Sequence, residues 1–180
     1  MKNPTCLNKR AEECMEEFKR AQAQLVVQPR QKPNGEIWQP PPLEVYKLNY
    51  DAALFSDLGK IGVGAVIRNE KGEVMVAMTA CGLAVQASEE AELLACRRAL
   101  EFAVDAGFYR LIIEGDNSNV THAISSSVDN YSLFGNVVDD IRHLIRGLHW
   151  STIWRIRRSG NRVAHVLAQH ARFTIDEDLY

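Results

Sequence analysis

The sequence predicts an α/β domain built on a mixed five-stranded sheet flanked by helices, with an N-terminal helical extension. Two observations predict this fold class: three β-type segments come first, and helical and β-type segments alternate after them. A Pro-rich stretch separates this region from a charged helical segment at the N-terminus. We therefore expect an N-terminal helix and linker over residues 1–43, the α/β domain over residues 44–173 and a C-terminal tail over residues 174–180.

The N-terminal segment at residues 8–27 has helical periodicity, with an apolar stripe made of Ala11, Cys14, Met15, Phe18, Ala21 and Leu25. Its other positions mix acidic and basic side chains, which favours a solvated or partner-packed helix over a nucleic-acid-binding arm. This helix is where we expect a fused or partner domain to attach. The linker that follows is broken by Pro29, Pro33, Pro40, Pro41 and Pro42. Trp38 lies inside it and is expected to dock on the domain.

The first half of the domain reads as three strands and a helix. The strands are expected at residues 45–53, 61–69 and 73–81. The turn residues Glu70, Lys71 and Gly72 join the second and third strands into a hairpin. A helix over residues 88–106 is expected to be capped by Ser88 and closed by Gly107.

The second half alternates between strand and helix. A short buried strand is expected at residues 111–114 and another strand at residues 151–157. Helices are expected at residues 117–126, 133–148 and 161–173. Because helical segments separate these strands, they should run parallel and be covered by helices.

Composition narrows the function classes. The 180 residues are 46% hydrophobic and 24% charged, which is ordinary for a domain that buries a core. The formal net charge of −2 excludes a polycation, so any nucleic-acid surface must be a local patch. The sequence contains neither an apolar run of membrane-spanning length nor a secretory signal in its first 25 residues. The four cysteines form no CxxC pair, so we expect reduced thiols inside the cell, with the nucleus and the cytoplasm left open.

Three acidic residues stand where burial should disfavour them. Asp51 lies in the first strand, Glu92 lies one turn into the first domain helix, and Asp116 follows the fourth strand. Each has a simpler interpretation: a turn at Asp51, an exposed first-turn glutamate, and a helix cap at Asp116 or Asn117. If the first and fourth strands are neighbours, however, the three carboxylates converge. A divalent cation such as Mg²⁺ would relieve their repulsion, and two ions about 4 Å apart could clamp a phosphodiester.

An ordered set of short motifs runs through residues 38–173. It consists of Trp38–Pro42, Lys47–Ala53, Gly62–Asn69, Ala91–Glu92, Glu114–Asp116 and Asn161–Ala168. The set resembles the plant ribonuclease H-like domain family, which is related to the reverse-transcriptase-associated ribonuclease H of non-LTR retroelements. The resemblance implies a ribonuclease H fold and hydrolysis of the RNA strand of an RNA–DNA hybrid. It also implies Mg²⁺, with Mn²⁺ as an alternative.

The resemblance further implies a catalytic set of four acidic residues, whose first three members match Asp51, Glu92 and Asp116 as metal ligands. It implies that Asp51 bridges two cations and that Glu92 lies near the ribose hydroxyl. The fourth position is His165, which removes a negative charge and is a poorer Mg²⁺ ligand. We hypothesise that water activation is impaired or requires Mn²⁺. A surface histidine without a role remains the alternative, and Glu114 is a secondary candidate that is better interpreted as structural.

Basic residues gather around the last strand and the last helix. The expected nucleic-acid-binding patch consists of Arg155, Arg157, Arg158, Asn161 and Arg162. A solvated edge is the alternative. Residues 125–132 contain neither Lys nor Arg, which predicts weak substrate affinity. The glycines Gly62 and Gly64 are not followed by a third glycine and a helix, so they predict close strand packing rather than a dinucleotide site.

Three functions therefore remain. The first is a metal-dependent ribonuclease acting on RNA–DNA hybrids. The second is a catalytically inactive ribonuclease H-like module that binds nucleic acid or protein, which His165 favours. The third is a retroelement remnant without a selected role. We expect a monomer that acts on nucleic acid away from membranes.

Overall fold

The computed structural model describes residues 38–126 and 134–174. The helix expected at residues 8–27 lies outside these ranges, and so does most of the connection around residues 125–132. The described part contains the strands β1 (Tyr46–Phe55), β2 (Lys60–Arg68), β3 (Val74–Leu83), β4 (Arg110–Gly115) and β5 (Trp150–Arg155). Its α-helices are α2 (Ser88–Asp105), α3 (Ser118–Ser125), α4 (Gly135–Arg146) and α5 (Arg162–His170), and a 3₁₀ turn at Ala171–Phe173 follows α5.

The five strands form one mixed sheet in the order β3-β2-β1-β4-β5. Strands β1, β2 and β3 pair antiparallel, whereas β1, β4 and β5 pair parallel. The predicted hairpin between β2 and β3 is confirmed, and Gly72 takes the positive φ of 78° that its turn requires. The expected fold class is therefore correct. Above all, the first and fourth strands are neighbours, which the convergence of the carboxylates required.

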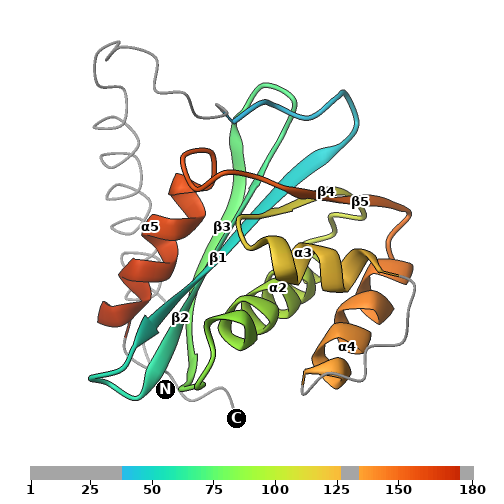
Figure 1. The fold of residues 1–180 in the computed structure, drawn as a ribbon. Helices are drawn as coiled ribbons and strands as arrows, with labels where there is room; N and C mark the ends of the chain where they lie inside the picture. Colours follow the sequence, from blue (N-terminus) through green and yellow to red (C-terminus); the bar gives the residue numbers. More distant parts are fainter. Residues whose placement is uncertain (1–37, 127–133, 175–180) are drawn as a thin grey trace, which may run out of the picture. The chain divides into compact units, whose positions relative to one another are not determined.

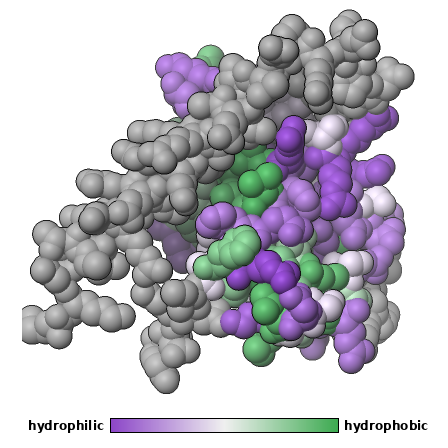
Figure 2. All heavy atoms as spheres, turned by 90° about the vertical axis from the view of Figure 1, so that its left-hand side faces the viewer, coloured by the Kyte–Doolittle hydropathy of each residue, from purple (hydrophilic) through white to green (hydrophobic). Residues whose placement is uncertain are grey.

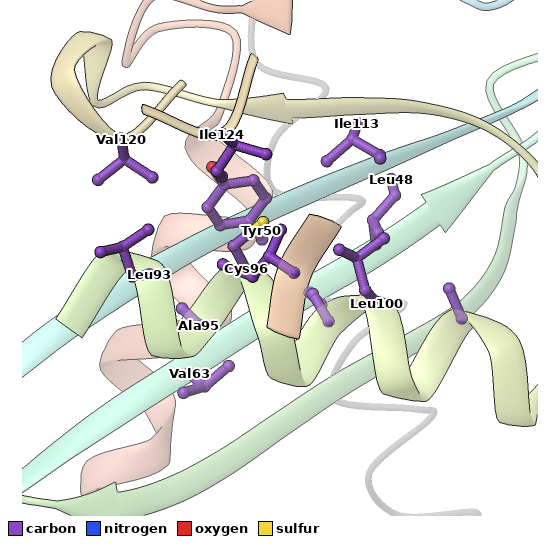
Figure 3. Close-up of a cluster of buried hydrophobic side chains, with 14 of the residues drawn as sticks. Leu48, Tyr50, Val63, Leu93, Ala95, Cys96, Leu100, Ile113, Val120 and Ile124 are labelled. Atoms are coloured by element: carbon purple, nitrogen blue, oxygen red, sulfur yellow. The ribbon is translucent and has the colours of Figure 1, made fainter. Parts of the chain in front are cut away.

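The helices lie in two layers, with α2, α3 and α4 on one side of the sheet and α5 on the other (Figure 1). The main core lies between the sheet and α2, where Leu48, Tyr50 and Ile113 meet Cys96 and Leu100 of the helix (Figure 3). These five side chains are at most 1% exposed. Burial of this many apolar groups is what holds α2 rigidly against β1.

The ends of α2 follow the predicted signals in one case and not in the other. At its C-terminus, Gly107 has a φ of 83°, and the amide groups of Gly107 and Phe108 donate to the carbonyl oxygens of Val104 and Ala103. This is the glycine-closed end that was expected. At its N-terminus, Ser88 was expected to be the cap, but Ser88 is the first helical residue and Ala87 precedes it without a side-chain hydrogen bond. The helix therefore begins without a capping side chain.

The glycines of β2 allow α5 to approach the sheet closely. A Cβ atom at Gly64 would overlap the carbonyl oxygen of Ala164 and the amide nitrogen of Ala168, and one at Gly62 would overlap the carbonyl oxygen of Ala168. The prediction of close packing is thus correct, although the partner is the backbone of a helix rather than another strand.

The surface fits the composition. The part of the α5 side that grey atoms leave visible is mostly hydrophilic, with separate groups of hydrophobic side chains (Figure 2). Among the exposed large apolar side chains are Trp150 and Trp154 on the outer strand β5. Within the described residues, no helix combines the length and apolar character of a membrane span.

Candidate metal centre

Asp51 lies in the interior of β1 and is 3% exposed. The strand continues four residues beyond it to Phe55, and Asp51 stands opposite Gly64 of β2, so the interpretation as a turn residue is wrong. Burial raises the pKa of Asp51, while a hydrogen bond from His165 acts in the opposite direction. A buried carboxylate in a strand therefore needs a positively charged or hydrogen-bonding partner.

Glu92 is the fifth residue of α2, and it lines a cavity together with Asp51 and Ala52 of β1. Its Oε2 atom is buried and has no hydrogen-bond partner within the structure. Burial, together with the charges of Asp51 and Asp116, raises the pKa of Glu92 to about 9. The simple first-turn glutamate is therefore not what the structure contains, because such a residue would keep its carboxylate in water.

Asp116 directly follows β4, whose last residue is Gly115. The capping of α3 falls to its neighbour Asn117, whose side-chain oxygen accepts hydrogen bonds from the amide groups of Asn119 (3.0 Å) and Val120 (3.2 Å). Because Asn117 occupies the cap, the carboxylate of Asp116 is free to turn towards β1 and α2.

The three carboxylates meet. One oxygen from each of Asp51, Glu92 and Asp116 can be chosen so that all three lie within 4.8 Å of one another. They line a cavity of about 190 Å³ together with Ala52, Leu54, Ser88, Ala91 and Arg158. The three carboxylates come from β1, from α2 and from the position directly after β4, as the sequence predicted. The centre lies where ligand sites form in such sheets, at the carboxyl end of parallel strands.

The donor set fits a hard divalent cation. Three carboxylates converge, and Glu92 leaves one buried oxygen without a partner. Oxygen ligands of this kind suit Mg²⁺ and Mn²⁺. Neither zinc-type thiolate nor paired imidazole ligands join the group among the described residues.

His165 lies against this group on α5. Its Nδ1 atom is 2.7 Å from Asp51 Oδ2, and its side chain is 26% exposed. The histidine therefore contacts the acidic cluster through Asp51 and is only partly exposed. His165 does not belong to the group of candidate metal ligands, which consists of the three carboxylates alone among the described residues.

The residues of the expected nucleic-acid-binding patch differ in their exposure. Arg155, Arg157, Arg158 and Arg162 are exposed, and Arg158 also lines the cavity. Asn161 differs from the expectation, because it is 1% exposed and its amide group donates to the carbonyl oxygen of Tyr50 over 2.8 Å. Asn161 thus joins the start of α5 to β1 from inside and does not belong to the exposed patch.

A second buried polar group was not predicted. Lys47 Nζ lies 2.8 Å from Glu114 Oε1, and Asn49 donates to Glu114 Oε2 over 2.9 Å. The indole N–H of Trp38 donates to Asn49 Oδ1 over 3.0 Å, which confirms that Trp38 docks on the domain. We call Trp38, Lys47, Asn49 and Glu114 the Lys47–Glu114 cluster. Its signal in the sequence is the alternation of Lys47, Asn49 and Asp51 with apolar residues in one strand.

Solved structures share this fold. Ribonuclease H1 from the archaeon Halobacterium salinarum has a TM-score of 0.65 and 24% identity, over 71% of this chain and 96% of its own. LC11-RNase H1, isolated from compost and solved with an RNA/DNA hybrid, has a TM-score of 0.61 and 20% identity, over 70% and 95%. A foamy viral protease-reverse transcriptase with an RNA/DNA hybrid has a TM-score of 0.58 and 17% identity, over 82% of this chain and 23% of its own.

No curated protein matches the sequence. Residues 49–171, which carry the sheet, the three carboxylates and His165, match the reverse transcriptase-like family. This match spans more than half of the chain, and the solved structures show the ribonuclease H fold. The protein therefore belongs to the reverse transcriptase-like family and has a ribonuclease H-like fold.

Proposed function

We propose that this domain binds RNA–DNA hybrids and hydrolyses their RNA strand with the help of a divalent cation. One observation carries the proposal: carboxylates from β1, α2 and the end of β4 lie within 4.8 Å of one another in a cavity. LC11-RNase H1 and a foamy viral protease-reverse transcriptase, of which the matching part is 23%, were solved with an RNA/DNA hybrid, which supports this choice of substrate.

The proposed catalytic residues are Asp51, Glu92 and Asp116 as metal ligands, with His165 beside them. When bound, Mg²⁺ or Mn²⁺ would polarise the scissile phosphodiester and ease the deprotonation of a water molecule. Glu92 must lose its proton before it can act as a ligand, because its pKa lies near 9 in the metal-free protein. We also propose that Glu92 lies near the ribose 2′-hydroxyl, the group that distinguishes RNA from DNA.

The exposed arginines Arg155, Arg157, Arg158 and Arg162 are the proposed contacts to substrate phosphates. Contacts of this type position a duplex without reading its sequence. Because residues 125–132 add no basic side chain, the affinity should be low and should fall steeply with salt.

The alternative function is a catalytically inactive ribonuclease H-like module that binds nucleic acid or protein. The observation that favours it is the hydrogen bond between His165 Nδ1 and Asp51 Oδ2. This bond engages an oxygen of Asp51 that a cation would otherwise receive, and an imidazole stands where the resemblance implies a fourth acidic residue.

We also propose a subtype, domain boundaries, an oligomeric state and a partner surface for this protein. We assign the domain to the plant, non-LTR retroelement type on its motifs, chiefly Trp38–Pro42 and Asn161–Ala168. We propose that residues 44–173 form the domain, that it acts as a monomer, and that residues 8–27 offer the surface for a fused or partner domain.

The test is cleavage of a labelled RNA–DNA hybrid by the full chain in Mg²⁺ and in Mn²⁺. We expect Asp51→Asn to lower the rate at least about 100-fold, because a metal ligand is lost. The matched control is Asp105→Asn at the exposed end of α2, which should leave the rate unchanged. Equal cleavage by wild type and Asp51→Asn would assign the activity to a contaminant and defeat the proposal.

A second variant separates the two functions. If His165 limits the reaction, His165→Asp should raise the cleavage rate in Mg²⁺ more than in Mn²⁺. A rate that does not rise would remove His165 as the cause of weak activity. Hybrid binding without cleavage in both proteins would favour the inactive module.

A further inference from the structure

The surroundings of Asp51 are divided by charge. Asp51 meets the acidic residues Glu92 and Asp116. Asp51 also contacts His165, and the guanidinium group of Arg158 lies next to that histidine, with its Nη2 atom 3.4 Å from His165 Nδ1. Among the described residues, the acidic group of three is the only cluster of metal-type ligands. The acidic and the basic neighbours of Asp51 therefore offer different partners to an incoming ion.

The contact with His165 leaves most N–H groups of Arg158 without a partner in that histidine. His165 Nδ1 lies 2.7 Å from Asp51 Oδ2 and 3.4 Å from Arg158 Nη2, so its shorter contact is with Asp51. The contact with His165 occupies at most one of the five N–H groups of Arg158. Within the part of the chain that the structure describes, Arg158 has no carboxylate in ion-pair contact, and it lines the cavity. Its N–H groups thus remain available to an anion in that cavity.

We propose that this centre takes one divalent cation, and that Arg158 supplies the second positive charge that holds the substrate phosphate. The acidic wall made of Asp51, Glu92 and Asp116 binds the cation. A second cation near His165 would meet no further carboxylate among the described residues and would be repelled by the guanidinium group. The planar guanidinium group suits a phosphate, to which it can donate two hydrogen bonds.

This inference rests on the proposed function for its phosphodiester, whereas the number of cations can be tested without any substrate. The first experiment is a calorimetric titration of the full chain with Mn²⁺ in the absence of nucleic acid. We expect one Mn²⁺ per chain for wild type. Arg158→Gln should still bind one, about 3- to 10-fold more tightly, because a neighbouring positive charge is gone. Arg110→Gln is the matched control at the far end of β4 and should stay within about twofold of wild type.

Two strong Mn²⁺ sites in wild type would overturn the inference, as would the absence of any binding. An Arg158→Gln affinity equal to that of Arg110→Gln would also overturn it. Arg158→Gln is expected to bind Mn²⁺ more tightly and the hybrid more weakly. This combination separates a direct role of Arg158 from a structural one, because a damaged fold would weaken the binding of both.

The second experiment measures binding of a 20-base-pair RNA–DNA hybrid in Ca²⁺ at several salt concentrations. We expect Arg158→Gln to bind about tenfold more weakly and to lower the salt slope by about 1, whereas Arg158→Lys should keep most of the slope. Arg158→Gln and Arg110→Gln losing affinity equally would overturn the role of Arg158. If wild type binds one Mn²⁺ but no hybrid, the proposed function and the part of Arg158 in it fail, while the single-cation part stands.

Discussion

Two buried acidic groups lie two residues apart on the same pair of strands, and they differ in what neutralises them. Glu114 is 4% exposed and is bonded to both Lys47 and Asn49. Asp51 lies two residues after Asn49 in β1, and Asp116 lies two residues after Glu114, just past the end of β4. Asp51, Asp116 and Glu92 approach one another, and among the described residues no lysine or arginine makes an ion pair with them. The Lys47–Glu114 cluster carries its own positive charge, whereas the metal centre must receive one from outside.

The sheet itself separates the two groups. Asn49 and Glu114 form the last register pair between β1 and β4. Beyond this pair, β4 ends at Gly115, while β1 continues to Phe55 paired only with β2. The paired strands thus hold the internally neutralised acid, and their point of separation gives the open cavity. The difference teaches that a buried carboxylate is structural where its partners are built in, and available for a ligand where they are not.

The Lys47–Glu114 cluster is also enclosed by aromatic rings. Lys47 Nζ lies 5.4 Å from the ring centres of both Trp38 and Trp154, and the guanidinium group of Arg68 lies 4.6 Å from that of Trp38. Contacts of this kind stabilise a cation that has little water around it. They explain why Lys47 can be 2% exposed.

The sharpest test of the comparison removes Glu114. Glu114→Ala should lower the free energy of unfolding by about 3–5 kcal/mol, because it leaves Lys47 buried without a partner. Urea denaturation in EDTA measures this change. Glu101→Ala, which breaks only surface contacts with Arg97 and Arg98, should cost at most about 0.5 kcal/mol. Similar values for the two variants would mean that the buried pair contributes nothing special.

The metal centre should respond to an added cation, whereas the Lys47–Glu114 cluster should not. At 100 times its dissociation constant, Mn²⁺ should stabilise wild type by about 2.7 kcal/mol, because it binds the folded state alone. Asp116→Asn should lose most of this gain, while Trp38→Phe should keep it. Thermal unfolding with and without Mn²⁺ checks the result. An equal gain in Asp116→Asn would place the cation elsewhere.

The pH dependence of the metal-free protein should come from the metal centre. The pKa of Glu92 is raised in the folded state to about 9 from an ordinary value of 4.5, so the folded protein holds a proton that the unfolded chain has lost. Stability is therefore fully present below pH 4.5 and falls as the pH rises towards 9, by at most about 1.4 kcal/mol per pH unit. Denaturation in EDTA from pH 5 to pH 8 should show this fall in wild type and a flatter profile in Glu92→Gln. Identical profiles would contradict the raised pKa.

The smallest effect concerns the edge of the Lys47–Glu114 cluster. Trp38→Phe keeps an aromatic ring but removes the N–H that donates to Asn49. The expected loss of stability is about 1 kcal/mol, measured by urea denaturation. Trp150→Phe, at a side chain that is 43% exposed, is the control and should change little. A loss well above that value would show that Trp38 contributes mainly by packing.

The site could be predicted because strongly polar residues stood in apolar surroundings at places that a mixed sheet brings together. Asp51 in a strand and Asp116 after a buried strand were visible in this way. The neighbouring positions of β1 and β4 were only a condition for the convergence of the carboxylates, and the order of the sheet meets it. The resemblance then drew attention to His165, whose contact with Asp51 depends on the docking of α5.

The remaining features depend on contacts that no local pattern encodes. Asn161 resembled a surface residue beside arginines, yet its amide is used between α5 and β1. The pairing of Lys47 with Glu114 joins residues 67 positions apart, so the sequence around either residue does not indicate the other as its partner. Ser88 has the chemistry of a cap, but it is the first helical residue, and Ala87 takes the cap position without a side-chain hydrogen bond.

The glycine at position 64 affects where His165 lies. It stands opposite Asp51 in the neighbouring strand, and its missing side chain is the space into which the backbone of α5 sinks at Ala164 and Ala168. A single methyl group there would lift the helix and draw the imidazole away from the carboxylate. The contact between His165 and Asp51 therefore depends on the absence of a side chain at Gly64 of β2.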